Sequence, residues 1–341
     1  MTTEGTTEIE RIAVIGGGSW GTALAGRLAA NGNDTTLWAY EPELVEEINS
    51  SHTNSLYLPG INLHPTLVCT GNLEEAVTGR SIVLLVTPVQ VMRGVLKQLA
   101  PHLRANAIIA NASKGIELET LKTVSQICGE LLGDAALTRY VALSGPTFAR
   151  EVAQELPSLI VAASRNEESS RRVQAAFSCP CLRVYTNSDV VGVELGGAVK
   201  NVIAIAAGIC DGLGFGYNAR AALITRGLAE MNRLGQAMGA QASTFAGLAG
   251  MGDLVLTCTG DLSRNRTVGF KLGQGMKLAD ILAEMRMVAE GVKSAESVFQ
   301  LAKRLGVEMP IVEKTYQILH DDKPARQAVI ELMTRDLKAE A

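Results

Sequence analysis

The first part of the chain, up to about residue 180, alternates short apolar runs with longer stretches of helical periodicity. The predicted strands are residues 11–15, 35–39, 82–86, 107–110, 140–143 and 159–162, and the first two predicted helices are 19–31 and 42–50. Because these strands are apolar throughout and are separated by helices, they predict a parallel sheet covered on both faces. The expected architecture is a doubly wound α/β domain.

The pattern changes near residues 186–189, and from Val190 onward only helical periodicity is found. The predicted helices there are 190–209, 220–238, 277–287, 293–305 and 310–320. We therefore expect a flexible tail (1–10), an α/β domain (11–188) and an all-α C-terminal domain (189–341). The longest strongly apolar stretch, 202–210, is too short to span a bilayer.

Composition narrows the class of protein. Hydrophobic residues make up 47% and charged residues 19%, and the net charge is 31 − 35 = −4, which argues against a nucleic-acid-binding surface. The polar N-terminus does not have the apolar core of a signal peptide. The six cysteines are scattered, with Cys179 and Cys181 as the close pair, and the four histidines are isolated. We expect neither a metal site nor a disulfide framework, and a cytoplasmic protein without an integral membrane segment.

A glycine-rich turn follows the first predicted strand and opens the first helix. Gly16, Gly18 and Gly21 fit the pattern G-x-G-x-x-G, and the second strand ends about 20 residues later. Gly16 would permit the tight turn, Gly18 the approach of a pyrophosphate, and Gly21 the close packing of helix on strand. The helix N-terminus would then face the phosphates. This context predicts a Rossmann-type domain that binds a dinucleotide.

The end of the second strand bears on the choice between NAD and NADP. Glu41 is placed where an acidic side chain would bind the ribose 2′-hydroxyl of NAD. It also precedes Pro42, where it would cap the next helix instead. Both interpretations stay open, and so does the choice of cofactor.

Two lysines are candidates for chemistry. Lys114 follows a predicted strand, where ligands bind in such sheets, although a solvated lysine is an equal alternative. Lys200 lies in an apolar helix with Gly196 and Gly197 one turn before it, so some other segment must approach that face closely. A lysine there needs a partner or must give up its proton, which favours an acid/base role. The alternative is a structural pair with a carboxylate such as Glu194.

A third cluster lies further along the chain. Asp253, which follows the glycines Gly250 and Gly252, would orient a substrate hydroxyl or a lysine. The run Ser263-Arg264-Asn265-Arg266 offers guanidinium, hydroxyl and amide donors suited to a phosphate monoester. A solvated basic turn is the alternative interpretation of this run.

Together these motifs resemble the bacterial NAD(P)-dependent glycerol-3-phosphate dehydrogenases. The resemblance extends from about Arg11 to beyond Pro310, in order and with consistent spacing. It rests on segments 16–21, 113–115, 144–149, 195–204, 210–216, 221–227, 252–259, 262–266 and 288–291. The Lys200 and Ser-Arg-Asn motifs are specific to the family, whereas the glycine-rich loop is shared with many dehydrogenases.

The resemblance implies roles for individual residues. Lys200 would exchange the proton of the substrate hydroxyl, with Lys114 and Asp253 as further catalytic residues. The implied cofactor contacts are Gly16, Gly18, Ser19, Trp20, Gly21, Tyr40, Lys114, Ala149, Arg264, Val288 and Glu290. The implied substrate contacts are Lys114, Gly145, Thr147, Lys200, Asn201, Asp253, Ser263, Arg264 and Asn265. The family often has His or Arg where this chain has Tyr40, which weakens any expectation of an NADP preference.

The implied reaction is the reversible, NAD(P)H-dependent reduction of dihydroxyacetone phosphate to sn-glycerol 3-phosphate, which supplies the phospholipid backbone. The implied assembly is a homodimer. Two other interpretations are a related 3-hydroxyacid dehydrogenase and a non-catalytic dinucleotide-sensing protein. Turnover with dihydroxyacetone phosphate would distinguish the three.

Overall fold

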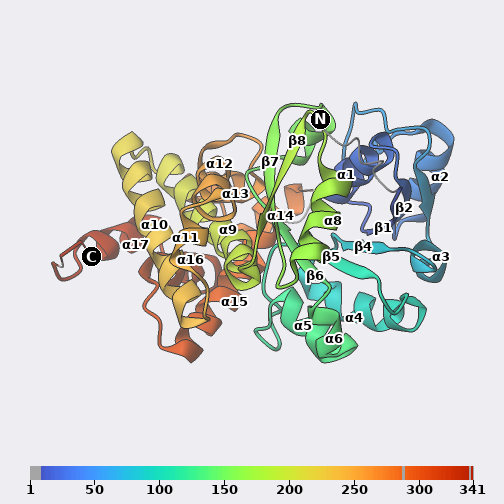
Figure 1. Ribbon diagram of the computed structural model, residues 1–341. Helices are drawn as coiled ribbons and strands as arrows, with labels where there is room; N and C mark the ends of the chain where they lie inside the picture. The colour runs from blue at the N-terminus through green and yellow to red at the C-terminus, as the bar shows by residue number, and fades with distance from the viewer. Residues whose placement is uncertain (1–8, 286–288, 338, 341) are drawn as a thin grey trace. The chain divides into compact units, whose positions relative to one another are not determined.

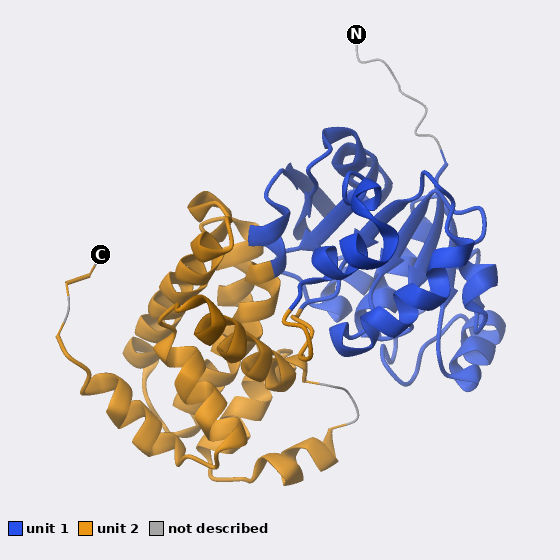
Figure 2. Ribbon diagram, turned by 90° about the horizontal axis from the view of Figure 1, so that it is seen from below, with its two compact units in different colours: residues 1–114, 122–194 blue, residues 115–121, 195–341 orange. Residues whose placement is uncertain are grey.

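The computed structural model describes residues 9–285, 289–337 and 339–340, and the chain divides into two compact units (Figure 2). Residues 9–114 and 122–194 form unit 1, and described residues from 115–121 and 195–340 form unit 2. Most of the predicted tail lies outside the described residues.

Unit 1 is built on one sheet of eight strands in the order β3-β2-β1-β4-β5-β6-β7-β8 (Figure 1). The strands are β1 (Arg11–Ile15), β2 (Asp34–Trp38), β3 (Val68–Thr70), β4 (Ile82–Leu85), β5 (Ile108–Asn111), β6 (Tyr140–Ser144), β7 (Ser158–Ala163) and β8 (Leu182–Asn187). β1 pairs in parallel with both β2 and β4, so the strand order reverses direction at β1. Ligands bind such sheets at this point, beyond the carboxyl ends of the strands.

Helices cover both faces of the sheet. They are α1 (Ser19–Ala30), α2 (Pro42–Ser51), α3 (Leu73–Val77), α4 (Val89–Leu99), η1 (Ala100–His102), α5 (Val124–Leu132), α6 (Asp134–Leu137), α7 (Ala149–Ala153) and α8 (Glu167–Phe177). On one face Ile12 and Val14 of β1 share a core with Leu24 of α1 and Phe177 of α8. The alternate strand residues, such as Ala13, are equally buried on the other face. Burial on both faces is why the central strands, such as β4 with the sequence Ile-Val-Leu-Leu, are apolar.

The sheet differs from the prediction at its two edges. The sequence did not predict β3 or β8, because β3 has three residues and β8 alternates buried Leu182 and Val184 with exposed Arg183 and Tyr185. β7 also runs antiparallel to β6, although β8 is parallel to β7. The Rossmann-type fold is confirmed, with a parallel sheet from β3 to β6 and a reversed pair at one edge.

Regular structure in the described residues after Asn187 is helical, as predicted. The elements are α9 (Val190–Gly212), α10 (Tyr217–Ala237), α11 (Ala242–Phe245), the π-turn η2 (Leu248–Gly252), α12 (Asp253–Thr259), α13 (Arg264–Gly273), α14 (Leu278–Glu284), α15 (Glu290–Leu305), α16 (Pro310–His320) and α17 (Ala325–Met333). The sequence did not predict α11, η2, α12, α13 or α17. The predicted helix 277–287 is shorter than expected, and its last two residues lie outside the described residues.

α9 is longer than its predicted helix and extends well beyond the apolar stretch within it. Among the described residues it is the helix long and apolar enough to cross a membrane, but 94% of its apolar window is buried inside the protein. It also carries the charged residues Glu194, Lys200 and Asp211. α9 is therefore the central helix of a packed core.

Candidate active site

The glycine-rich turn has the geometry that its sequence predicts. Gly16 follows β1 with φ of +131°, and a Cβ there would lie 2.9 Å from the carbonyl of Val86, beyond the end of β4. A Cβ on Gly21 would lie 1.9 Å from the carbonyl oxygen of Gly16. A Cβ on Gly18 would meet no atom within 4 Å. The first and third glycines are thus required by close packing, and the second leaves its side of the loop open to a ligand.

α1 begins directly after this loop. Its N-cap is Gly18, which has no side chain to cap the helix. The Ser19 hydroxyl donates a hydrogen bond to the carbonyl oxygen of Tyr57 at 2.5 Å, and Trp20 packs against the core of the sheet. The N-terminus of an uncapped helix attracts phosphate, so these residues fit a bound pyrophosphate.

The residues after β2 distinguish between the two roles considered for Glu41, a contact to the ribose and a cap of the next helix. Glu41 occupies the N-cap of α2, but its side chain makes no cap hydrogen bond. It instead accepts a hydrogen bond from the Tyr57 hydroxyl at 2.7 Å, and this bond together with burial raises the pKa of Tyr57 to about 12. The capping interpretation is therefore wrong. Tyr40 is 80% exposed beside it.

Other candidates of unit 1 follow the neighbouring strands. Lys114 lies half-buried in the loop after β5, and Gly145, Thr147 and Ala149 follow β6. Gly145 has φ of +155°, and a Cβ there would lie 2.8 Å from the carbonyl oxygen of Leu159. Because β1, β4, β5 and β6 are parallel, their carboxyl ends, and the residues that follow, share one edge of the sheet.

Lys200 of unit 2 forms a buried ion pair. Its side chain is 6% exposed and donates to Oδ1 of Asp253, which is fully buried. It also donates to the hydroxyl of Thr257 at 2.9 Å, and that hydroxyl donates to the main-chain oxygen of Asp253 at 2.6 Å. Thr257 was not among the predicted site residues, because its place one helical turn after Asp253 becomes meaningful only once α12 is known to be a helix.

The alternative partner for Lys200 is wrong. Glu194 is buried and accepts hydrogen bonds from the amide of Ser125 at 2.9 Å and the hydroxyl of Tyr140 at 2.6 Å. Burial raises the pKa of Glu194. Its hydrogen bonds join α9 to α5 and β6, so Glu194 has a structural role of its own.

A glycine of α9 allows the segment that leads to Asp253 to pack close to Lys200. A Cβ on Gly196 would lie 2.3 Å from the carbonyl oxygen of Ala249, so the backbone of η2 rests on α9 at the glycine before Lys200. η2 leads directly into α12, of which Asp253 is the first residue. The mid-helix glycine predicted that another segment approaches α9 closely. That segment is η2, which leads to Asp253, the partner of Lys200.

The residues of the Ser263–Arg266 run have different contacts and therefore different roles. Ser263 is the N-cap of α13, where its hydroxyl accepts from the amide of Arg266 at 3.2 Å. Arg266 also pairs with Asp211 at 2.8 Å and Asp261 at 2.9 Å. Arg264 is exposed and forms no hydrogen bond or ion pair with any described residue. It is therefore the guanidinium of this run that can bind a ligand.

Two buried asparagines link three helices. The amide of Asn265 donates to the side-chain oxygen of Asn201 at 3.0 Å and accepts from the backbone amide of Gly291 at 3.0 Å. This network joins α13, α9 and the start of α15, where Glu290 lies half-buried. Val288, the remaining candidate, lies outside the described residues.

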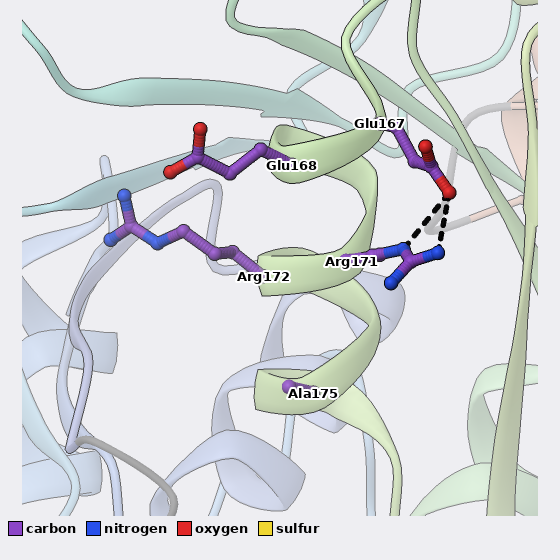
Figure 3. Close-up of a pocket in the computed structure, with 5 residues that line it drawn as sticks. All are labelled: Glu167, Glu168, Arg171, Arg172 and Ala175. Atoms are coloured by element: carbon purple, nitrogen blue, oxygen red, sulfur yellow. Dashed lines mark hydrogen bonds and ion pairs between the residues drawn. The ribbon is translucent and has the colours of Figure 1, made fainter.

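A separate hollow on α8 holds none of these candidates. It is lined by Glu167, Glu168, Arg171, Arg172 and Ala175 (Figure 3). Arg171 is paired with Glu167 one turn before it, and Arg172 with Glu10. The first is a solvated pair on the surface of α8, and the second is a part-buried pair that ties α8 to the residue before β1, so both arginines already have carboxylate partners and none of the candidate residues lies in this hollow.

Unit 1 thus holds a dinucleotide-type loop, and unit 2 holds a buried lysine–carboxylate pair and an exposed guanidinium. The N-terminal model of NAD-dependent glycerol-3-phosphate dehydrogenase matches residues 11–170, and the C-terminal model matches residues 189–330. The chain belongs to the NAD-dependent glycerol-3-phosphate dehydrogenase family. This assignment confirms the resemblance seen in the sequence.

Individual members of the family match nearly the whole chain. A glycerol-3-phosphate dehydrogenase [NAD(P)+] of Trichlorobacter lovleyi is 72% identical over 330 residues, covering 97% of this chain and 99% of that protein. The corresponding protein of Geobacter sulfurreducens is 68% identical over 331 residues, with the same coverage. The crystal structure of glycerol-3-phosphate dehydrogenase from Coxiella burnetii superposes with a TM-score of 0.92 at 40% identity, covering 96% of this chain and 99% of that one.

Proposed function

We propose that this protein catalyses the reversible, NAD(P)H-dependent reduction of dihydroxyacetone phosphate to sn-glycerol 3-phosphate. The observation that carries the proposal is the buried pair of Lys200 and Asp253. Family membership supplies the substrate class, and the pair supplies a proton donor in a site from which water is largely excluded.

The residues of unit 1 fit a dinucleotide. Gly18 presents open backbone, and α1 offers its uncapped N-terminus to the pyrophosphate. The dinucleotide, when bound, supplies or accepts the hydride. We assign Gly16, Gly21, Ser19, Trp20, Tyr40, Lys114, Ala149, Arg264, Val288 and Glu290 to its surroundings, as the family resemblance implies.

Lys200 handles the proton. During reduction the carbonyl oxygen gains negative charge, and the Lys200 ammonium stabilises this charge and donates a proton to the oxygen. Asp253 stabilises the ammonium form between turnovers, and Thr257 fixes the direction of the Nζ atom. In the reverse direction the neutral amine of Lys200 takes the proton from the substrate hydroxyl.

Arg264 binds the substrate phosphate. It is exposed at the first residue of α13 and has no described partner, and the N-terminus of that helix adds positive potential. The binding energy of the phosphate then positions the carbonyl for reaction. We assign Lys114, Gly145, Thr147, Asn201, Ser263 and Asn265 to the remaining substrate contacts. Asn201 and Asn265 are also hydrogen-bonded to each other, which holds α9 and α13 together beside the substrate.

The test is a spectrophotometric assay of the purified protein. Oxidation of NADH and of NADPH is followed with dihydroxyacetone phosphate and, in parallel, with 2- and 3-oxo acids. Rapid turnover that is confined to dihydroxyacetone phosphate is expected. A preference for an oxo acid would favour the 3-hydroxyacid dehydrogenase interpretation, and cofactor binding without turnover would favour a dinucleotide sensor.

We also propose a cytoplasmic homodimer that supplies the glycerophospholipid backbone. The homodimer is what the family resemblance implies, and large apolar side chains of unit 2 that are exposed in the single chain, among them Tyr217, Met251, Leu262, Ile330 and Met333, could be covered by it. Sedimentation equilibrium of the full chain tests the dimer, and a monomer at micromolar concentration would refute it.

A further inference from the structure

Two cysteines meet in a tight turn of unit 1. Cys179 and Cys181 flank Pro180 between α8 and β8, and their Sγ atoms lie 3.2 Å apart. The amide of Cys179 donates to the carbonyl oxygen of Leu182 at 2.9 Å, and the amide of Leu182 donates back at 3.1 Å. Pro180 occupies the first central position of this turn, where its ring restricts the backbone. The two thiols are therefore held together by a closed turn rather than by chance rotamers.

The pair also differs from the other cysteines in accessibility. Cys69, Cys128, Cys210 and Cys258 are buried, whereas Cys179 and Cys181 are half-buried. Burial raises the pKa of Cys69 to about 12 and that of Cys258 to about 12. Because these four thiols are buried, a small disulfide in solution does not reach them in the folded protein, whereas it reaches the half-buried pair.

Charged groups beside the pair set the conditions for its reaction. Arg27, at the end of α1, is ion-paired with Glu155 and lies near the thiols. Burial and the hydrogen bond that the Cys181 thiol donates to Cys179 raise the pKa of Cys181 to about 11, with Arg27 opposing the rise and Glu155 adding to it. The thiol of Cys181 is therefore protonated at neutral pH, and its reactions accelerate in alkali.

We propose that Cys179 and Cys181 form a dithiol modification site that closes to an intramolecular disulfide by exchange with a low-molecular-weight disulfide. One protein thiolate attacks the small disulfide, which forms a mixed disulfide and releases one small thiolate. The second protein thiolate attacks the protein sulfur of the mixed disulfide and releases the other. The two protein sulfurs are oxidised, the small disulfide is reduced to two thiols, and these take up the two protons that the cysteines lose.

The geometry favours closure over a lasting mixed disulfide. A disulfide bond is about 2.05 Å long, so the two sulfurs, now 3.2 Å apart, approach by little more than about 1 Å. The bond would close a loop of three residues, which restricts the unfolded chain only slightly. Its half-buried position leaves it open to reducing thiols. The product is therefore a reversible modification and not a structural crosslink.

The experiment uses the reduced, full-length protein and oxidised glutathione, at neutral and at alkaline pH. After acid quenching and alkylation, trypsin releases both cysteines in the single peptide 173–183. We expect this peptide to become lighter by two hydrogen atoms, without glutathione or alkyl groups, faster in alkali, and to regain both thiols with dithiothreitol. The variants Cys179→Ser and Cys181→Ser, which retain one thiol each, are expected to accumulate a stable glutathione adduct.

Other results would overturn the proposal. A glutathione adduct that persists on the wild-type peptide would show that the second thiol cannot reach the first. A peptide that stays reduced in alkali, or a disulfide between two chains, would also refute it. Since the readout is the mass of this peptide, its outcome is independent of the proposed activity.

Discussion

Replacing Lys200 by Met is expected to have two consequences, one for catalysis and one for stability. The substitution removes the proton donor, so kcat should fall by roughly 10²- to 10⁴-fold, the usual contribution of a general acid. It also leaves Asp253, which is fully buried, without its counter-ion. Breaking a buried pair from one side costs about 3–5 kcal/mol of stability. A loss of activity in this variant alone would therefore not separate the two effects.

The double variant Lys200→Met/Asp253→Asn separates them. The neutral amide has nearly the shape of the carboxylate but needs no counter-ion, so most of the lost stability should return. The proton donor is still absent, so kcat should stay as low as in the single variant. Urea denaturation gives the free energies of unfolding, and steady-state kinetics with saturating dihydroxyacetone phosphate gives kcat. NADH affinity, followed by fluorescence, should be close to that of the wild type in both variants.

Two results would refute this reasoning. A general acid contributes at least about 10²-fold to kcat. If the double variant kept more than about a tenth of the wild-type kcat, the loss would be smaller than that contribution, and the proton would not come from Lys200. If the single variant were as stable as the wild type, Asp253 would not be a buried charge that depends on Lys200.

Three further predictions concern substrate, cofactor and pH. Arg264→Ala should lower kcat/KM for dihydroxyacetone phosphate roughly 10- to 10³-fold and leave unphosphorylated dihydroxyacetone nearly unaffected, whereas Arg266→Ala should lower stability without discriminating between them. The wild type should use NADH at least as well as NADPH, and Tyr40→Arg should shift the kcat/KM ratio toward NADPH roughly 10- to 100-fold; an unchanged ratio would contradict this. Burial raises the pKa of Glu230 from 4.5 to about 7, so between these pH values the folded state holds a proton that the unfolded state has lost. The free energy of unfolding should therefore fall by about 3 kcal/mol as the pH rises from 4.5 to 7. Glu230→Gln should abolish this pH dependence of the free energy of unfolding, measured by urea denaturation. If the variant and the wild type had identical pH profiles, Glu230 would not be the group that titrates.

Which elements could be predicted depends on where they lie in the fold. β1, β4 and β5 are buried on both faces, so each is a continuous apolar run that the sequence reveals directly. β3 and β8 form the edges of the sheet, where half of the side chains need not be apolar, and no such run marks them. The short helices α12 and α13 were likewise missed, because they are held by their neighbours rather than by a long periodic pattern of their own.

The sequence points to the residue types of the candidate site but not to the pairs that they form. A lysine in an apolar helix indicated Lys200, yet the nearest carboxylate along the chain, Glu194, is not its partner. The partner is Asp253, 53 residues further on, and only the folded chain brings it there. The Ser263–Arg266 run likewise looked like one set of donors in the sequence. In the structure its successive residues are a helix cap, an exposed guanidinium, a buried amide and a structural ion pair.

These pairings depend on glycines at which backbones meet. A Cβ on Gly208 of α9 would lie 2.0 Å from the carbonyl oxygen of Arg266, and one on Gly269 of α13 would lie 2.0 Å from that of Ile205. Gly212 and Gly273 repeat this one turn further along each helix. α9 and α13 therefore cross in direct backbone contact, which leaves little room for either to shift or rotate. Since α9 carries Lys200 and α13 begins at Arg264, the crossing fixes the proposed proton donor and the proposed phosphate-binding residue relative to each other before any substrate arrives.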